Sequence, residues 1–267
     1  MIKIINEYCE KGIPLLEDYS IDLVVTSPPY NVDLGNNKYH KSSYDIYNDN
    51  KDHHKYILWL KNIFAIIYKK LVLGGRVCIN VGDGGNGSVP TSSDIIQFMK
   101  ELRYIPLTHI IWDKSQTSNR AAWGSYKSPS CPSFPTPFEH IMVFAKTNKK
   151  LQRNGKTDLS EDEFVSWTIA LWKFPPELRQ DEFGHKAMFP EELPKRCIKM
   201  FSYVDSLILD PFNGAGTTAV VCKKLNRNYI GFEISKAYCT ITEKRLNTLE
   251  ELINDNKKQK TIEDAWS

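Results

Sequence analysis

Thr26-Ser27-Pro28-Pro29-Tyr30 is the stretch that most constrains the fold of this chain. It follows Ile21–Val25, an apolar run that is typical of a buried parallel strand. Because neither proline has an N–H to give to a sheet ladder, the chain must leave the sheet at the carboxyl end of this strand. Open α/β sheets bind their ligands at that edge. The sequence therefore predicts an α/β fold with a ligand site here, and a simple Pro-Pro turn is the alternative.

The two prolines also make the backbone of this stretch rigid. Each fixes its own φ and restricts the residue before it, so the carbonyl groups of Ser27 and Pro28 point in set directions. Tyr30 adds a flat aromatic face beside these acceptors. Such an arrangement suits a planar group that carries an amine, for example a nucleobase. We therefore take Ser27, Pro28, Pro29 and Tyr30 as the candidate catalytic residues.

A second motif lies far downstream. Leu207–Asp210 predicts another buried strand, and the glycine-containing turn Pro211–Gly216 leads from it into a helical pattern. Glycines let the backbone approach a ligand closely, and a helix N-terminus offers free N–H groups. The next strand, Asn228–Phe232, ends at Glu233, where an acid is placed to hold ribose hydroxyls. This order indicates a cofactor that contains adenosine. Its candidate contacts are Asp210, Pro211, Phe212, Gly214, Gly216, Thr217 and Glu233.

Together, residues 26–30 and 210–218 resemble the motifs of the DNA amino-methyltransferases that use S-adenosylmethionine. The similarity covers most of the chain and thins towards the C-terminus. Because the target-amine motif precedes the glycine motif, the order is that of the circularly permuted group called beta. Further segments similar to the family's motifs are Leu71–Gly75, Gly82-Asp83, His185–Pro190 and Leu193-Pro194.

The resemblance implies a mostly parallel seven-stranded sheet with helices on both faces, and a base that is flipped out of duplex DNA. The Ser27 side chain and the Pro28 carbonyl would accept the two N–H bonds of the target amine, while Tyr30 stacks on the base.

The resemblance also implies a division of work around the cofactor. Asp210 would meet the methionine end and Glu233 the ribose, with Phe189 and its neighbour in the motif, His185, closing the methionine side.

The first position of the target-amine motif bears on which base is methylated. Serine, as in Ser27, is typical of family members that act on cytosine-N4, whereas those that act on adenine-N6 mostly carry Asp or Asn. We expect cytosine-N4, with adenine-N6 as the alternative. More distant alternatives are an RNA or protein-glutamine methyltransferase, and a DNA-binding module without activity.

Residues 115–184 break the regular pattern and form the candidate target-recognition region, around a strand at Phe138–Lys146. Basic and aromatic residues interleave in the loop before this strand, which suits phosphate contacts and base stacking. A solvated proline-rich loop is the alternative. The basic run that follows the strand suits contacts with the DNA backbone. The candidate DNA-binding residues are Arg120, Trp123, Tyr126, Lys127, Lys149, Lys150 and Arg153.

Periodicity predicts the remaining elements. Strands are expected at Ile2–Ile5, Arg76–Val81 and Tyr104–Trp112, and helices at His53–Lys70, Thr91–Arg103, Glu191–Tyr203 and Tyr238–Ile253. We expect Gly74-Gly75 to end the first of these helices and the serines near Thr91 to cap the second. The chain thus divides into a catalytic region (1–114), the recognition region (115–184), a cofactor-binding region (185–253) and a frayed tail (254–267).

Composition narrows the classes further. A chain of 267 residues can bury one substantial core, which favours one catalytic domain with an insertion. No apolar run is long enough to span a membrane, and the N-terminus lacks the zones of a signal peptide. Six cysteines without paired spacing indicate reduced thiols in a cytoplasmic protein, and argue against a metal site.

Double-stranded DNA is the expected partner. Because the net charge is only +3, affinity for DNA must come from local basic patches. The sequence leaves open whether a cognate restriction endonuclease accompanies the chain, and whether the chain is a monomer or a homodimer.

Overall fold

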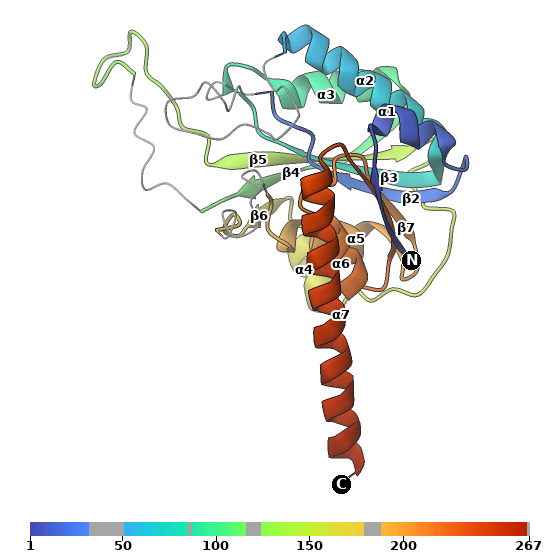
Figure 1. The fold of residues 1–267 in the computed structure, drawn as a ribbon. Helices are drawn as coiled ribbons and strands as arrows, with labels where there is room; N and C mark the ends of the chain where they lie inside the picture. Colours follow the sequence, from blue (N-terminus) through green and yellow to red (C-terminus); the bar gives the residue numbers. More distant parts are fainter. Residues whose placement is uncertain (32–50, 85–86, 116–123, 179–187, 266–267) are drawn as a thin grey trace.

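The computed structural model describes residues 1–31, 51–84, 87–115, 124–178 and 188–265, with side chains in the last helix described as far as Asp255. They form a twisted sheet with helices on both faces, and the C-terminal helix extends away from it (Figure 1). The strands are β1 (Ile2–Asn6), β2 (Ile21–Thr26), β3 (Leu71–Val81), β4 (Tyr104–Asp113), β5 (Phe138–Lys146), β6 (Leu171–Lys173), β7 (Leu207–Asp210) and β8 (Asn228–Glu233). The helices are α1 (Cys9–Gly12), α2 (His53–Lys70), α3 (Thr91–Glu101), α4 (Glu161–Trp167), α5 (Glu192–Phe201), α6 (Thr217–Lys224) and α7 (Lys236–Ala265), with a 3-10 turn at Ile13–Leu15.

The strand order is β1-β8-β7-β2-β3-β5-β4-β6, and among these described strands β5 alone runs antiparallel to its neighbours. The mostly parallel α/β sheet expected from the sequence is confirmed. The described residues form one strand more than the seven expected, because the three-residue β6 pairs with the outer edge of β4. Trp172 in β6 is buried and donates its indole N–H to the Trp167 carbonyl at 3.0 Å, which holds the strand in place.

The two motif-bearing strands are neighbours in the middle of the sheet. Leu23 of β2 pairs with Ile208 of β7, and Val24 pairs with Leu209, so the strands run parallel and end at the same edge. The target-amine motif and the glycine turn therefore leave the sheet side by side, as the permuted motif order requires.

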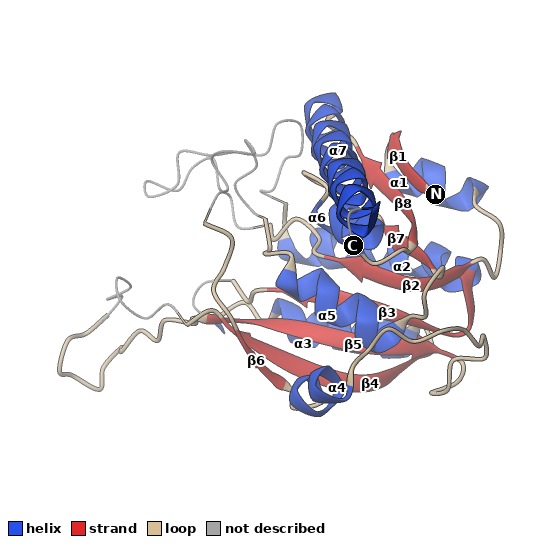
Figure 2. Ribbon diagram, turned by 90° about the horizontal axis from the view of Figure 1, so that it is seen from below, coloured by secondary structure: helices blue, strands red, loops and turns tan. Residues whose placement is uncertain are grey.

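Helices on both faces bury the sheet. Helices α1 to α3 cover one face and α4 to α7 the other (Figures 1 and 2). Under α2 and α3 the core is built from large side chains such as Tyr56, Phe64 and Phe144. On the other face Trp112 and Tyr229 are buried under α5 and α6. The spacing of apolar residues that predicted α2 is confirmed, since that helix has the bounds expected from the sequence.

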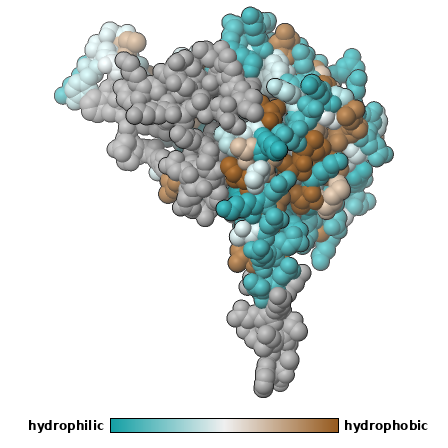
Figure 3. Space-filling view, viewed as in Figure 1, coloured by the Kyte–Doolittle hydropathy of each residue, from teal (hydrophilic) through white to brown (hydrophobic). Residues whose placement is uncertain are grey.

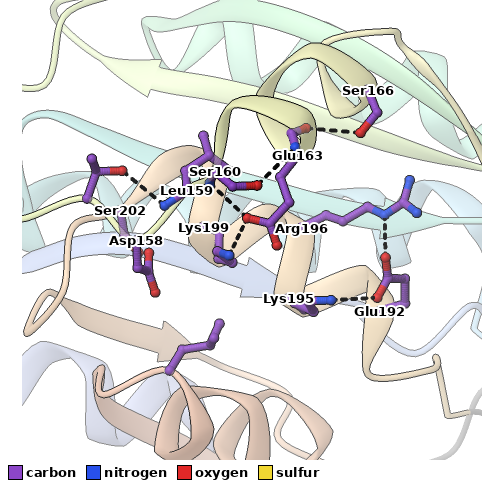
Figure 4. A network of polar contacts seen from close by, with 12 residues as sticks. Asp158, Leu159, Ser160, Glu163, Ser166, Glu192, Lys195, Arg196, Lys199 and Ser202 are labelled. Atoms are coloured by element: carbon purple, nitrogen blue, oxygen red, sulfur yellow. Dashed lines mark hydrogen bonds and ion pairs between the residues drawn. The ribbon is translucent and has the colours of Figure 1, made fainter.

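Helix α4 is tied to α5 by polar contacts (Figure 4). Ser160 and Glu163 form a capping box at the start of α4, in which each side chain accepts the other residue's backbone N–H. The Glu163 carboxylate also pairs with Lys199 of α5. Trp167, at the end of α4, is buried. This part of the expected recognition region is therefore built into the core of the fold.

The sequence analysis expected the Gly74-Gly75 pair to end α2, and this expectation is wrong. The helix ends at Lys70 and β3 begins at once, so both glycines lie inside the strand. Gly74 has φ +72° at an irregularity in the β2–β3 pairing, and a Cβ there would lie 2.1 Å from the Lys150 carbonyl oxygen. Glycine is needed here because the chain after β5 crosses β3 closely.

Two helices differ from expectation at their ends. The start of α3 is capped by Asp83, whose carboxylate accepts from the Ser92 N–H at 2.8 Å, rather than by the serines of the helix itself. Helix α7 continues to Ala265 instead of ending at Ile253, because no proline or glycine interrupts the segment expected to fray. None of the described helices is long and apolar enough to cross a membrane.

Candidate active site

A cavity of about 410 Å³ lies at the carboxyl ends of β2, β7 and β8. It brings together most of the candidate catalytic and cofactor-binding residues, from two motifs that are far apart in the sequence. Those that line it are Ser27, Pro28, Pro29, Tyr30, Phe189, Pro211, Phe212, Gly214, Thr217 and Glu233. A volume of this size suits a small-molecule ligand.

Glu233 stands at the end of β8 with its carboxylate fixed by the glycine turn. One oxygen accepts from the Gly214 N–H at 2.8 Å, and the other accepts from the Ser235 N–H at 2.8 Å. These two bonds orient the carboxylate, which lines the cavity.

Gly216 was expected to contact the cofactor, but it is absent from the cavity wall. It has φ +78°, and a Cβ on it would lie 2.3 Å from Thr242 Cγ2. The glycine is needed for the close approach of α7 to the turn.

Asp210 is fully buried and does not line the cavity, so the expected direct contact with the methionine end is not seen in the geometry. Its carboxylate accepts hydrogen bonds from Thr26 Oγ1 at 2.7 Å, Thr218 Oγ1 at 3.0 Å and the Phe212 N–H at 3.0 Å. Burial raises the pKa of Asp210 to about 6, against these three hydrogen bonds, which lower it. The residue holds β2, the glycine turn and α6 together.

The target-amine motif ends in a buried polar cluster. Tyr30 donates its hydroxyl to Glu139 Oε2 at 2.8 Å and accepts from Ser27 Oγ at 3.0 Å. Asn80 of β3 donates to both Tyr30 Oη and Glu139 Oε2. Lys114, just after β4, pairs with Glu139.

Sequence reasoning missed Asn80, Lys114 and Glu139, because they come from strands β3 and β5 and from the end of β4 rather than from a recognisable motif. Polar residues inside or directly beside apolar strands were the available signal, as in the runs Cys78–Val81 and Phe138–Val143.

Two further residues of the cavity wall were missed. They are Glu10 of α1 and Trp59 of α2, and Tyr8, just before α1, also lines the cavity. The indole N–H of Trp59 donates to Glu10 Oε1, and its ring lies 5.4 Å from that of Phe212. Hydrophobic side chains gather on this side of the molecule, over α1, β1 and the start of α7 (Figure 3). These two neighbouring rings, of Trp59 and Phe212, offer aromatic surface to a flat heterocycle.

The DNA-binding candidates are not gathered at one place. Arg120 and Trp123 lie outside the described residues, as do residues 32–50 and the cofactor candidate His185. Tyr126 and Lys127 lie on an exposed loop, with the Lys127 Nζ 5.2 Å from the centre of the Tyr126 ring.

Lys149, Lys150 and Arg153 lie at the other end of the sheet. Arg153 binds the buried carboxylate of Asp22, at 3.1 and 3.2 Å, where β2 begins, whereas the cavity lies where β2 ends. Strand β2 has six residues, so this separation is about 20 Å. The geometry does not bring these three residues to the cavity.

No metal site was expected from the sequence. Within the described part of the chain, no group of three His, Cys, Asp or Glu side chains is placed to hold a metal ion.

Solved DNA methyltransferases share this α/β fold. A Thermus thermophilus protein solved with bound S-adenosyl-L-methionine superimposes with a TM-score of 0.73 and 24% identity, covering 93% of this chain and 94% of that one. The PvuII DNA methyltransferase, which is cytosine-N4-specific, superimposes with a TM-score of 0.68 and 19% identity, covering 95% and 91%. At these identities the likeness concerns the fold.

The sequence identifies the family. Residues 21–244 match the N6/N4 methyltransferase family model, described as DNA methylase. Two type II methyltransferases of Methanocaldococcus jannaschii are similar: M.MjaI, 31% identical over 89% of both chains, and M.MjaVI, 33% identical over 68% of this chain and 94% of that one. The chain belongs to the N6/N4 DNA methylase family, which confirms the resemblance in its motifs. Family and fold support S-adenosylmethionine as the cofactor.

Proposed function

We propose that this DNA methyltransferase transfers the methyl group of S-adenosylmethionine to the N4 amine of a cytosine flipped out of duplex DNA, and that it belongs to a type II restriction-modification pair. The observation that carries the proposal is the cavity shared by Ser27, Tyr30 and Glu233. It joins an amine-binding motif to a cofactor-binding one. Relatives named as type II methyltransferases support the biological setting.

The residues present fit the cofactor. Glu233 offers carboxylate oxygens for ribose hydroxyls, and the rings of Phe212 and Trp59 suit an adenine. Phe189 and Thr217 line the same cavity and are proposed for the methionine portion. Asp210 supports the glycine turn from behind rather than touching the ligand. The cofactor supplies a methyl group that its positively charged sulfur has already activated.

The chain's own contribution is to hold the amine. An exocyclic base amine is a poor nucleophile because its lone pair is delocalised into the ring. Hydrogen bonds from its two N–H groups to Ser27 Oγ and the Pro28 carbonyl steer that lone pair, while Tyr30 stacks on the flipped base. Positioning of this kind contributes several kcal/mol, up to roughly 7–11 in ideal cases.

Ser27 is the feature that favours cytosine over adenine. A neutral hydroxyl has a shorter reach and less charge than an Asp carboxylate, which suits a smaller ring held mainly by the Pro28 carbonyl. The adenine-N6 activity found elsewhere in the family is the second candidate, because both bases present an exocyclic amine beside a ring nitrogen.

We propose the exposed loop that carries Tyr126 and Lys127 as the DNA-contacting segment of the recognition region. The same role is proposed for Arg120 and Trp123, which belong to the same stretch of sequence.

The test is a measurement of methylated nucleosides. DNA from methylation-deficient cells that express the chain is digested and analysed by mass spectrometry, and we expect N4-methylcytosine. Finding N6-methyladenine alone would replace the base assignment and leave the fold, the cofactor and the holding of the amine as proposed. Finding neither nucleoside, with the purified protein folded and supplied with cofactor, would contradict the proposed function.

A further inference from the structure

A chain of hydrogen bonds leads from the target-amine motif to a carboxylate in the core. Ser27 Oγ donates to Tyr30 Oη at 3.0 Å, and Tyr30 Oη donates to Glu139 Oε2 at 2.8 Å. Ser27 and Tyr30 line the cavity, whereas the Glu139 side chain is 9% exposed and lies behind them. The bonds thus link the surface that meets the substrate to a group that the substrate does not touch.

Three hydrogen-bond donors converge on the Glu139 carboxylate. Its Oε1 pairs with the Lys114 ammonium, and its Oε2 accepts from Asn80 Nδ2 at 2.7 Å as well as from Tyr30. Because the carboxylate accepts from Lys114 and Asn80, it acts as an acceptor towards Tyr30 too, and the hydrogen of the Tyr30 hydroxyl points towards it.

Asn80 supports the same direction. Its amide nitrogen donates to both Tyr30 Oη and Glu139 Oε2, while its buried Oδ1 has no hydrogen-bond partner within the described residues. Leaving an acceptor unpaired in the core is unfavourable. The amide nevertheless presents its donor side to these two oxygens, which is the arrangement that two accepting oxygens require.

The direction of these hydrogen bonds determines whether Ser27 donates or accepts in the cavity. The Tyr30 hydroxyl hydrogen is used on Glu139, so its oxygen is an acceptor towards Ser27. The single hydrogen of the Ser27 hydroxyl is then used on Tyr30. The Ser27 oxygen therefore has only lone pairs for the cavity.

We propose that Glu139 is a positioning residue which, through Tyr30, fixes Ser27 Oγ as an acceptor towards the target amine. The inference rests on the proposed function and deepens it. A free serine hydroxyl donates or accepts, and would serve an amino group or a carbonyl group equally well. With its hydrogen committed to Tyr30, Ser27 accepts the N–H of an amine and offers nothing to the carbonyl of uracil or thymine. The buried carboxylate thereby gives a neutral serine the selectivity for amino bases.

The test is Glu139→Gln, which keeps the shape of the side chain. A glutamine amide donates as well as accepts, so the hydrogen bonds that link residues 139, 30 and 27 can reverse. The Ser27 hydrogen then points into the cavity. We expect kcat for methylation of duplex DNA to fall by roughly 10- to 100-fold, the effect of losing one oriented hydrogen bond in the reacting complex. The cofactor Kd, measured by calorimetry, should stay within about twofold, because Glu139 does not line the cavity.

Two further variants separate this role from a structural one. Glu163→Gln removes a comparable Glu–Lys pair on α4, away from the cavity, and should leave kcat unchanged. In the double variant Ser27→Ala with Glu139→Gln, single-turnover rates should match those of Ser27→Ala within about twofold, because Glu139 acts through Ser27.

The opposing outcomes are distinct. Glu139→Gln with an unchanged kcat, or with an equal loss in the Ser27→Ala background, would overturn the inference and leave the proposed function intact. A wild-type protein that methylates no DNA base would contradict both the inference and the proposed function.

Discussion

The Thr26 hydroxyl donates to the buried Asp210 carboxylate at 2.7 Å, across 184 positions of sequence. Thr26 ends β2 and Asp210 ends β7, so this bond joins the last residues of the two central strands. The same carboxylate accepts from the Phe212 N–H and from Thr218 at the start of α6. The distance between the amine-binding motif and the glycine turn is thereby fixed by a residue that does not line the cavity.

Asp210 should make stability depend on pH. Its pKa rises from 3.8 to about 6 on folding, mainly through burial, so folding favours the protonated form. The resulting stabilisation is complete below pH 4 and is lost as the pH rises through 6. Relative to Asp210→Asn, the wild type should lose up to about 3 kcal/mol between pH 4 and pH 7. Urea unfolding of both proteins across this range measures the difference in their free energies of unfolding. A difference that does not change with pH would contradict the shifted pKa.

Glu233 should contribute directly to cofactor affinity. Glu233→Ala removes the carboxylate proposed for the ribose hydroxyls, and we expect binding of S-adenosylmethionine to weaken by about 1–3 kcal/mol. Because Glu233 also accepts from Gly214 and Ser235, Glu233→Gln serves as the control that preserves the shape of the turn. Titration calorimetry on the folded variants measures both. Unchanged affinity in the alanine variant would exclude the ribose role.

Much of the fold was predictable because hydrophobic periodicity is local. Helix α2 and strand β5 have the bounds expected from the sequence, since buried apolar residues recur along one face of α2 and run without a break from Ile141 to Ala145 in β5. Gly74 was misassigned because glycine is needed there for a tertiary contact, the close crossing of the backbone at Lys150. A glycine that ends a helix and a glycine that admits a neighbouring backbone look alike in sequence.

The residues that line the cavity were predictable only where they belong to a recognisable sequence motif. Ser27 and Glu233 follow strands in recognisable patterns, and both line it. Trp59 lies within the predicted helix His53–Lys70 and Glu139 within the predicted strand Phe138–Lys146, and neither belongs to a motif. Their place beside or behind the cavity follows from the strand order, in which β5 pairs with β3, and no local pattern encodes that order.

Tyr30 should act on the base and not on the cofactor. Tyr30→Ala removes a stacking ring worth roughly 1–3 kcal/mol for an unstacked base, while cofactor affinity stays nearly intact. With the wild type, 2-aminopurine at the target position should brighten as the base leaves the duplex, and with the variant the change should be smaller. Absence of brightening with the wild type at every position of a methylated site would argue against flipping.

Lys127 is expected to contact DNA phosphate from its exposed loop. Lys127→Ala should weaken binding to all duplex sequences about equally and lower the slope of log affinity against log salt by about 1. Because the side chain is exposed, thermal unfolding should be unaffected. Fluorescence anisotropy between about 50 and 200 mM salt provides the measurement. An unaltered slope would mean that this lysine makes no phosphate contact.

Arg153 was a candidate for DNA binding, but its geometry predicts a role in stability instead. Its guanidinium holds both oxygens of Asp22, whose side chain is 2% exposed at the start of β2. In Arg153→Ala that carboxylate keeps the hydrogen bond from the Leu207 N–H, at 2.8 Å, and loses those from the guanidinium. Losing the bonds from a charged partner should lower the free energy of unfolding by roughly 1–3 kcal/mol. The salt slope of DNA binding should not change, because the residue lies at the far end of β2 from the cavity. Urea unfolding and anisotropy on the same variant test both parts. Retained stability with a reduced salt slope would restore Arg153 to the DNA interface.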